Sequence, residues 1–220
     1  MSMKRFLPVF IFCLSCNIGS SKPVDNINPV NSVNNQEYQN MSKAYFASGC
    51  FWCVETIYES LYGVKEVYSG YAGGSTKNPN YYQVMSGKTG HAEAIEIIYD
   101  SSKISFDTLL KVFFDSHNPT TPNRQGPDYG TQYRSIAFYN NEDERIKITN
   151  YINFLSTSSI FGKNIITEVK KIDNFYYAEE YHQDYEKKNP YNPYVQGVSI
   201  PRFNNFKQKA SSYIKIKDDH

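Results

Sequence analysis

The sequence predicts one α+β domain in which helices pack on a mixed sheet, and three observations support this fold class. At 220 residues, with 40% apolar and 20% charged side chains, the chain has the length and composition of about one globular domain. Segments with the composition of strands alternate with segments of helical periodicity over residues 43–172. From residue 174 onward the chain is aromatic, polar and interrupted by Pro, which predicts a long C-terminal coil around the core.

The first helix is predicted by the spacing of its apolar side chains. A short strand over residues 43–47 precedes it, and Gly63 ends it. Between them, apolar side chains recur at i, i+3, i+4 and i+7, at Val54, Ile57, Tyr58 and Leu61. This spacing predicts a helix with one buried stripe.

The remaining elements follow in order along the chain. Strands are predicted over residues 64–71, 91–99, 134–139 and 165–172, and helices over residues 105–116 and 142–155. Residues 118–130 contain three Pro and two Gly and therefore predict a long surface loop. Loops of this length in compact domains often carry function.

The charge balance excludes one class of function. The chain has 23 basic and 22 acidic side chains and a formal net charge of +1. It lacks the basic field that nonspecific nucleic-acid binding needs, so we expect no nucleic-acid partner.

The N-terminus has the pattern of an export signal. Lys4 and Arg5 precede the apolar residues 6–14, a run too short to span a bilayer as a permanent helix. A small residue, Ser15, stands before Cys16, as in bacterial lipoprotein signals, in which the Cys is acylated and becomes the mature N-terminus. An ordinary cleaved signal and an uncleaved anchor are the alternatives. We expect an exported protein of the cell envelope or periplasm, held at the membrane by a lipid anchor.

The predicted organisation has four parts. Residues 1–16 form the signal peptide, and residues 17–42, which are rich in Asn and have no apolar periodicity, form a flexible tether. Residues 43–203 form the folded body. Residues 204–220 contain several Lys and are expected to form a solvated polar tail.

Two cysteines at the start of the first helix carry the predicted chemistry. Cys50 and Cys53 are spaced i, i+3, which places them on one side of the first turn within reach of a disulfide. Cys50 also meets the free N–H groups and the positive end of the helix dipole, which favour its thiolate. We therefore expect Cys50 to be a nucleophile and Cys53 its resolving partner.

The pair alone leaves two other interpretations open: a zinc half-site and a thioredoxin-like disulfide exchanger. Zinc needs about four ligands, and no two of the four His stand at metal-binding spacing, so we expect no metal. The residues between the thiols are Phe51 and Trp52, which suit an apolar pocket better than an open docking surface.

A set of motifs in fixed order resembles the A-type peptide methionine sulfoxide reductases. The motifs span about residues 43–200 and are Gly49-Cys50-Phe51-Trp52, Gly70-Tyr71-Ala72-Gly73-Gly74, Asn78-Pro79-Asn80-Tyr81, Gly90-His91-Ala92-Glu93-Ala94, Gly130-Thr131-Gln132-Tyr133-Arg134-Ser135 and Tyr181-His182-Gln183. The resemblance implies reduction of the S epimer of methionine sulfoxide, free or within proteins, without a cofactor. It also implies a two-layer α/β sandwich, for which we expect a ferredoxin-like core.

That reaction needs an acid that stays protonated near neutral pH, because a neutral sulfoxide sulfur is a poor electrophile until its oxygen is protonated or firmly hydrogen-bonded. Glu93 shares a strand face with His91 and Ile95, and a carboxyl group buried among such neighbours has a raised pKa. Glu96, on the opposite face, satisfies the alternation equally well. The resemblance selects Glu93.

The resemblance also assigns roles to four aromatic side chains. Tyr81 and Tyr133 correspond to tyrosines that hydrogen-bond the sulfoxide oxygen. Phe51 and Trp52 are expected to enclose the substrate methyl group.

Two further residues complete the predicted site. Asp128, in the long loop, matches a carboxylate that helps to hold water and the substrate site. His182 is expected to orient its neighbours rather than to react.

The expected cycle leaves Cys50 as a sulfenic acid, which Cys53 converts to a disulfide that a thioredoxin-like reductant reduces. Many family members carry resolving cysteines near the C-terminus, but residues 191–202 contain none. The sequence therefore leaves open whether Cys53 resolves the sulfenic acid or the reductant attacks it directly. A second class of function, an exported docking or disulfide-exchange module, also stays open from the sequence.

Overall fold

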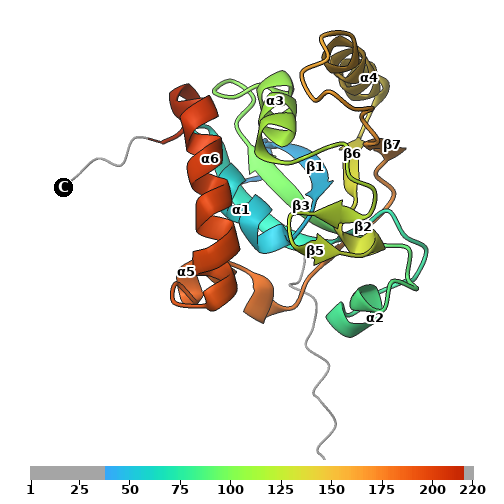
Figure 1. Ribbon diagram of the computed structural model, residues 1–220, viewed down its shortest axis with the longest axis vertical. Coiled ribbons are helices and arrows are strands. Elements are labelled where there is room, and N and C mark those ends of the chain that lie inside the picture. The colour runs from blue at the N-terminus through green and yellow to red at the C-terminus, as the bar shows by residue number, and fades with distance from the viewer. Residues whose placement is uncertain (1–37, 216–220) are drawn as a thin grey trace, which may run out of the picture.

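The computed structural model describes residues 38–215, which form a six-stranded sheet with helices packed against it (Figure 1). The sheet order is β7-β6-β1-β3-β2-β8, and the strands are β1 (Ser42–Ser48), β2 (Val64–Ala72), β3 (Ala92–Tyr99), β6 (Ser135–Tyr139), β7 (Glu168–Lys171) and β8 (Phe175–Tyr177). The β6–β7 pair is parallel and the other pairs are antiparallel. The predicted α+β class with a mixed sheet is confirmed.

In this described part of the chain, six α-helices accompany the sheet. They are α1 (Phe51–Glu59), α2 (Tyr81–Met85), α3 (Phe106–Ser116), α4 (Glu142–Thr157), α5 (Tyr185–Lys188) and α6 (Ile200–Ala210). Two of the predicted helices begin at side-chain caps: Ser105 accepts a hydrogen bond from the Thr108 N–H, and Asn141 accepts one from the Glu144 N–H. The caps explain why these helices begin where the polar residues stand.

The main core lies between the sheet and the helices. Phe46, from the central strand β1, is fully buried and stacks on Tyr58 of α1 and on Phe106 and Phe113 of α3. This packing fixes α1 against β1, the strand that directly precedes it in the chain. The N-terminus of α1 is therefore held rigidly at the end of β1, beside β3.

The predicted loop over residues 118–130 contains a small hairpin. Strands β4 (Arg124–Gln125) and β5 (Asp128–Tyr129) pair antiparallel, and the Arg124 guanidinium lies 4.2 Å from the centre of the Tyr129 ring. The hairpin brings Asp128 back toward the N-terminus of α1.

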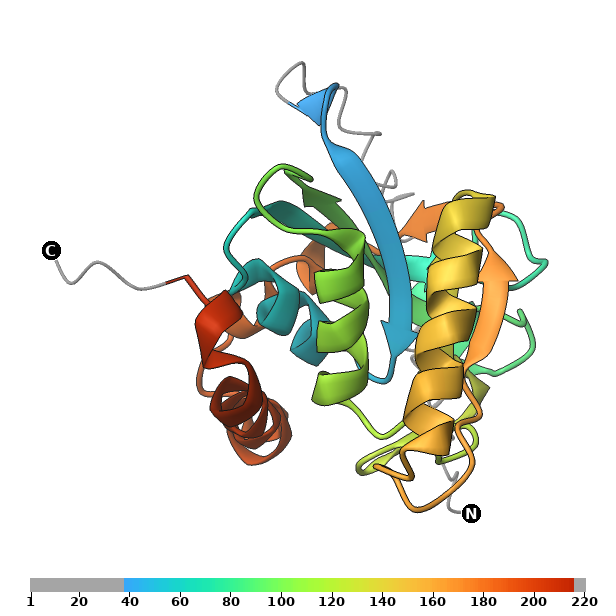
Figure 2. The ribbon, with the colours of Figure 1, turned by 90° about the horizontal axis from the view of Figure 1, so that it is seen from above.

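The expected long C-terminal coil and polar tail are wrong over residues 200–210, which form the helix α6 against α1 and α3 (Figures 1 and 2). Phe206 is 1% exposed and Ala210 is fully buried, so one face of α6 belongs to the core. The lysines of this segment occupy the other face of the helix. An isolated bridge between Leu61 and Ile214 extends the folded body past the expected limit at residue 203.

The predicted signal peptide, with Cys16, and most of the tether lie outside the described residues. Within residues 38–215, no helix combines the length and the apolar character needed to cross a membrane.

Candidate active site

Cys50 caps the N-terminus of α1 at a sharp turn after β1. The turn depends on Gly49, whose φ of 93° is unfavourable for other residues. A Cβ atom at this position would also lie 2.6 Å from Cβ of Gln125. The geometry of this turn therefore requires Gly, and it places the Cys50 thiol at the first turn of the helix.

Both thiols are free and nearly buried, with Cys50 6% and Cys53 2% exposed. Burial, followed by the neighbouring Cys53, raises the pKa of Cys50 well above its ordinary value. The pKa of Cys53 falls to about 7, chiefly because Cys50 donates a hydrogen bond to it, with help from the charge of Arg202 and from Ser199. In the resting pair, burial therefore opposes the expected Cys50 thiolate, while the hydrogen bond from Cys50 favours the thiolate of Cys53.

Glu93 lies directly beside the N-terminus of α1. Its Oε2 accepts a hydrogen bond of 2.9 Å from the backbone N–H of Phe51, the residue after Cys50. The side chain is 2% exposed, and burial raises its pKa to about 8. The structure thus brings together the thiol and a carboxyl group that is neutral at physiological pH.

Glu96, the alternative acid, lies on the other face of the sheet in a satisfied network. Its carboxylate accepts hydrogen bonds from Lys43 Nζ at 2.9 Å, Tyr45 Oη at 3.0 Å and Tyr177 Oη at 3.0 Å. A carboxylate with a cationic partner and two phenols has a structural role, which agrees with the choice of Glu93.

The rings of Phe51 and Trp52 are held in an aromatic cluster. Trp52 stacks on Tyr185 with ring centres 3.7 Å apart and donates a hydrogen bond from Nε1 to Nδ1 of His182 at 3.2 Å. Phe51 contacts the same His182 ring, with 5.0 Å between ring centres. Burial lowers the pKa of His182 to about 4, so the ring is neutral, and the Trp52 bond places its proton on Nε2.

Tyr81 contacts the same cluster, with its ring centre 4.6 Å from that of His182. Glu179 fixes its backbone, because Oε1 accepts from the Tyr81 N–H at 2.9 Å while Oε2 accepts from the Tyr71 hydroxyl at 2.8 Å. Burial, followed by the charge of Glu93, raises the pKa of Tyr81 to about 12, so its hydroxyl stays a donor.

Tyr133 and Asp128 approach the site from the segment after the hairpin and from the hairpin itself. The Tyr133 hydroxyl donates to Sδ of Met85 at 3.5 Å, so it already faces a thioether sulfur. Burial raises its pKa, with further contributions from Glu93 and Tyr81. Asp128 is half-buried and accepts a hydrogen bond of 2.6 Å from the hydroxyl of Tyr194.

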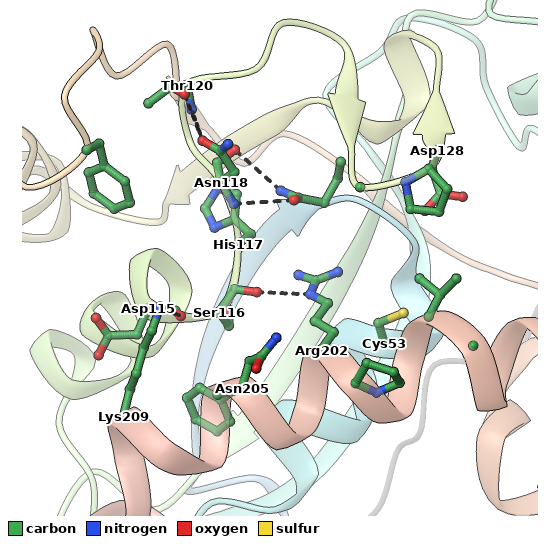
Figure 3. A pocket seen from close by; sticks show the side chains of 18 of the residues that line it. Cys53, Asp115, Ser116, His117, Asn118, Thr120, Asp128, Arg202, Asn205 and Lys209 are labelled. Carbon is green, nitrogen blue, oxygen red and sulfur yellow. Dashed lines mark hydrogen bonds between the residues drawn. The ribbon is translucent and has the colours of Figure 1, made fainter.

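A cleft of about 810 Å3 opens on the side of Cys53, between α6, the end of α3 and the β4–β5 hairpin (Figure 3). Arg202 lies between Cys53 and Ser116, and its guanidinium donates to the backbone oxygens of Ser116 at 2.9 Å and Ser48 at 3.0 Å. Within residues 38–215 it makes no ion pair with a carboxylate. Its positive charge therefore acts on Cys53.

All the described site residues predicted from the sequence lie around the two thiols, and sequence reasoning missed five others. Tyr194, Glu179, Glu186, Ser199 and Arg202 come from the segment expected to be coil. Tyr194 and Arg202 stand in the aromatic, basic stretch after residue 190, but polar residues without periodicity gave no signal of where they fold. No group of three or more His, Cys, Asp or Glu in the described part of the chain is arranged to hold a metal ion.

Comparisons with known proteins agree with the motifs. Residues 42–214 match the family model described as peptide methionine sulfoxide reductase. The chain is 47% identical over 180 residues to the peptide methionine sulfoxide reductase MsrA of Nautilia profundicola, covering 82% of this chain and 98% of that protein. It is 52% identical over 153 residues to the MsrA of Trichodesmium erythraeum, covering 70% and 86%.

Two solved structures share the fold. Mxr1 from Saccharomyces cerevisiae in reduced form has a TM-score of 0.65 and 34% identity, covering 69% of this chain and 87% of that one. Methionine sulfoxide reductase A of Corynebacterium diphtheriae has a TM-score of 0.64 and 33% identity, covering 70% and 79%.

Proposed function

The chain belongs to the peptide methionine sulfoxide reductase family, and from this premise we propose that it reduces the S epimer of methionine sulfoxide with Cys50 as the nucleophile and Glu93 as the proton donor. The observation that carries the assignment is the hydrogen bond from the Phe51 N–H to Glu93, which holds a neutral carboxyl group beside the Cys50 turn. The substrates are free methionine sulfoxide and oxidised methionine side chains of proteins.

Glu93 activates the sulfoxide by protonating its oxygen. At neutral pH it carries a proton, since its pKa is about 8, and it passes this proton to the sulfoxide oxygen as Cys50 attacks the sulfur. The Cys50 thiol proton returns to Glu93, methionine leaves, and the oxygen remains on Cys50 as a sulfenic acid. Burial of both groups favours this exchange, because neither needs to be charged before the substrate arrives.

Two tyrosine hydroxyls bind the oxygen during this step. Tyr81 and Tyr133 both have raised pKa values with Glu93 among the causes, which supports hydroxyl groups near the acid. Donors aimed at an oxygen that gains charge stabilise the transition state more than the ground state. Phe51 and Trp52 form the apolar wall for the methyl group.

Two residues support these groups without reacting. Asp128 accepts the hydrogen bond of Tyr194, whose hydroxyl acts on the Cys50 thiol and lowers its pKa against burial. His182 holds Trp52 through its Nδ1.

Cys53 converts the sulfenic acid to a Cys50–Cys53 disulfide, which a thioredoxin-like dithiol reduces. Its low pKa and its contact with Cys50 support this role. No other cysteine stands in the folded body, so no third thiol within residues 38–215 competes with it.

The test is conversion of dabsyl-methionine S-sulfoxide to dabsyl-methionine by residues 38–220 with dithiothreitol, the R epimer serving as the control. We expect turnover of the S epimer alone, and none by the variant Cys50→Ser. Turnover by that variant, or of the R epimer at an equal rate, contradicts the proposed site.

The N-terminus gives a separate proposal: the protein is exported and anchored through acylated Cys16. The support is the basic start, the short apolar run and the small residue before Cys16. Fractionation of cells that express the full chain should find it with the membranes and the variant Cys16→Ser in the soluble fraction. Membrane retention of that variant contradicts the lipid anchor.

The four central strands give one further proposal, that the core is ferredoxin-like. The order β6-β1-β3-β2, with α1 and α3 packed against β1, supports it.

A further inference from the structure

A second carboxyl group lies close to the reacting sulfurs, on the side of Cys53. Cys53 Sγ lies 2.9 Å from Ser199 Oγ, at the end of a π-helical turn (Val195–Ser199), and both side chains are almost fully buried. The carboxyl group of Glu186, from α5, lies near the hydroxyl groups of Ser199 and Thr56. A π-helical turn inside a helical segment is often found at a functional site.

Resting on the proposed function, we propose that Glu186 takes up the proton of Cys53 through the Ser199 hydroxyl when the disulfide forms, and returns it when the disulfide is reduced. Glu186 thus serves Cys53 as Glu93 serves Cys50. It exchanges the proton of Cys53 through the Ser199 hydroxyl and does not contact the substrate.

The surroundings of Glu186 suit this task. Its Oε1 is buried and has no hydrogen-bond partner in the described residues. The adjacent lysines are engaged elsewhere, Lys187 with Glu59 at 2.8 Å and Lys188 with Glu180 at 3.5 Å. Burial raises the pKa of Glu186, while the hydroxyl groups of Ser199 and Thr56 and the charge of Arg202 lower it. The net effect is an increase, which brings the carboxyl group closer to the range where it can exchange a proton.

Cys53 needs such a group only after the first half of the reaction. In the resting pair, the largest cause of its lowered pKa is the hydrogen bond from Cys50. Formation of the sulfenic acid consumes that thiol, while burial continues to raise the pKa of Cys53. A nearby base is then required to make the Cys53 thiolate that attacks.

The other charged groups around Cys53 cannot take this proton. Glu93 faces it from β3 but is already protonated up to about pH 8. Tyr194, just before the π-helical turn, has a raised pKa and keeps its own proton. Arg202 of α6 is a permanent cation and cannot accept one. Among the described residues, the further titratable group that acts on Cys53 is Glu186.

The resolving step balances in atoms and electrons. The S–H bond of Cys53 breaks and its proton passes through Ser199 to Glu186. The Cys53 sulfur, which is oxidised, bonds to the Cys50 sulfenic sulfur, which is reduced. The S–O bond breaks, and the hydroxide leaves as water with a proton from Glu93.

The reducing step restores the starting state. A thiolate of the external dithiol attacks the Cys50 sulfur, the S–S bond breaks, and the released Cys53 takes back the proton held by Glu186. The second thiol of the dithiol then attacks the mixed disulfide and releases Cys50, and the dithiol leaves as a disulfide. Its two protons go to Cys50 and to Glu93, so both are protonated again. Attack at Cys50 makes Cys53 the leaving group, and the charge of Arg202 and the Ser199 hydroxyl stabilise its thiolate.

The experiment is a single turnover with methionine S-sulfoxide and no reductant, followed at several pH values. In quenched samples, methionine is measured by chromatography. The Cys50 sulfenic acid, trapped with dimedone, and the disulfide are measured by mass spectrometry. The variants are Glu186→Gln, which keeps the shape of the side chain, Glu186→Asp and Ser199→Ala. The matched control is Glu180→Gln, whose side chain is 70% exposed.

We expect Glu186→Gln to slow disulfide formation about 100-fold near neutral pH, the lower end of the range for general acid–base catalysis, with methionine formation unchanged. The pH at which disulfide formation becomes fast should move upward, and Glu186→Asp should restore part of the rate. Ser199→Ala should match Glu186→Gln, and the double variant should be no slower than either.

An unchanged rate and pH profile in Glu186→Gln overturn the inference, as does an equal loss in Glu180→Gln. Methionine formation by the wild type without any disulfide also overturns it, while leaving reduction at Cys50 in place. Absence of methionine in the wild type refutes the proposed function instead.

Discussion

Replacing Glu93 with Gln should remove a free-energy cost that the folded protein bears in order to keep this group protonated. Burial raises the pKa of Glu93 from 4.5 to about 8, so between these values the folded state binds more protons than the unfolded state. The free energy of unfolding of the wild type therefore decreases as the pH rises through this window. At about 1.4 kcal/mol per pKa unit, the contribution of Glu93 changes by about 3 kcal/mol between about pH 5 and about pH 7.5.

The assay is urea unfolding of wild type and Glu93→Gln at both pH values. Gln can still accept the Phe51 N–H bond, and any loss from its amide group is the same at each pH, so the difference between the two pH values isolates the titration. We expect the stability of the variant relative to the wild type to increase by about 3 kcal/mol from the lower to the higher pH. A relative stability that stays constant refutes the claim that burial holds Glu93 neutral.

Three other changes have defined outcomes. Cys53→Ser should leave a stable sulfenic acid at Cys50 after one turnover, which mass spectrometry detects. Unimpaired turnover of this variant with a thioredoxin-like reductant contradicts the resolving role. Tyr133→Phe should lower kcat about 100-fold with little change in KM, because its hydroxyl acts on the developing charge; steady-state kinetics showing a loss confined to KM argue against this. Phe206→Ala should destabilise the fold by about 3 to 5 kcal/mol, while the exposed neighbour Gln208→Ala should not; equal unfolding midpoints would show that α6 does not belong to the core.

The part of the fold that the sequence predicted is the part with strong periodicity. The apolar stripe at Val54, Ile57, Tyr58 and Leu61 predicted α1, and the β-branched residues within 91–99 predicted β3. The helix α6 was missed because only Phe206 and Ala210 on it are fully buried, among several lysines. Two buried apolar residues are too few to distinguish this helix from a polar tail. Only the three-dimensional arrangement shows that α1 and α3 expose an apolar surface for it to pack on.

The site was predictable where motifs fix a residue to a turn or a strand. The placement of Glu93 beside the Cys50 turn follows from the antiparallel pairing of β1 with β3. The alternation of residues along the strand could not by itself distinguish Glu93 from Glu96 as the acid. The relative acidity of the two thiols was not predictable, since it depends on the hydrogen bond between them, on burial and on Arg202, which reaches Cys53 from a segment far away in the sequence.

The pH dependence of methionine formation in a single turnover tests the central claim most directly. With Glu93 as the acid, the rate constant should be flat below about pH 8 and fall above it as the carboxyl group ionises, and this fall should be absent from the residual activity of Glu93→Gln. The same fall in both proteins would assign the proton to another group and contradict the role of Glu93.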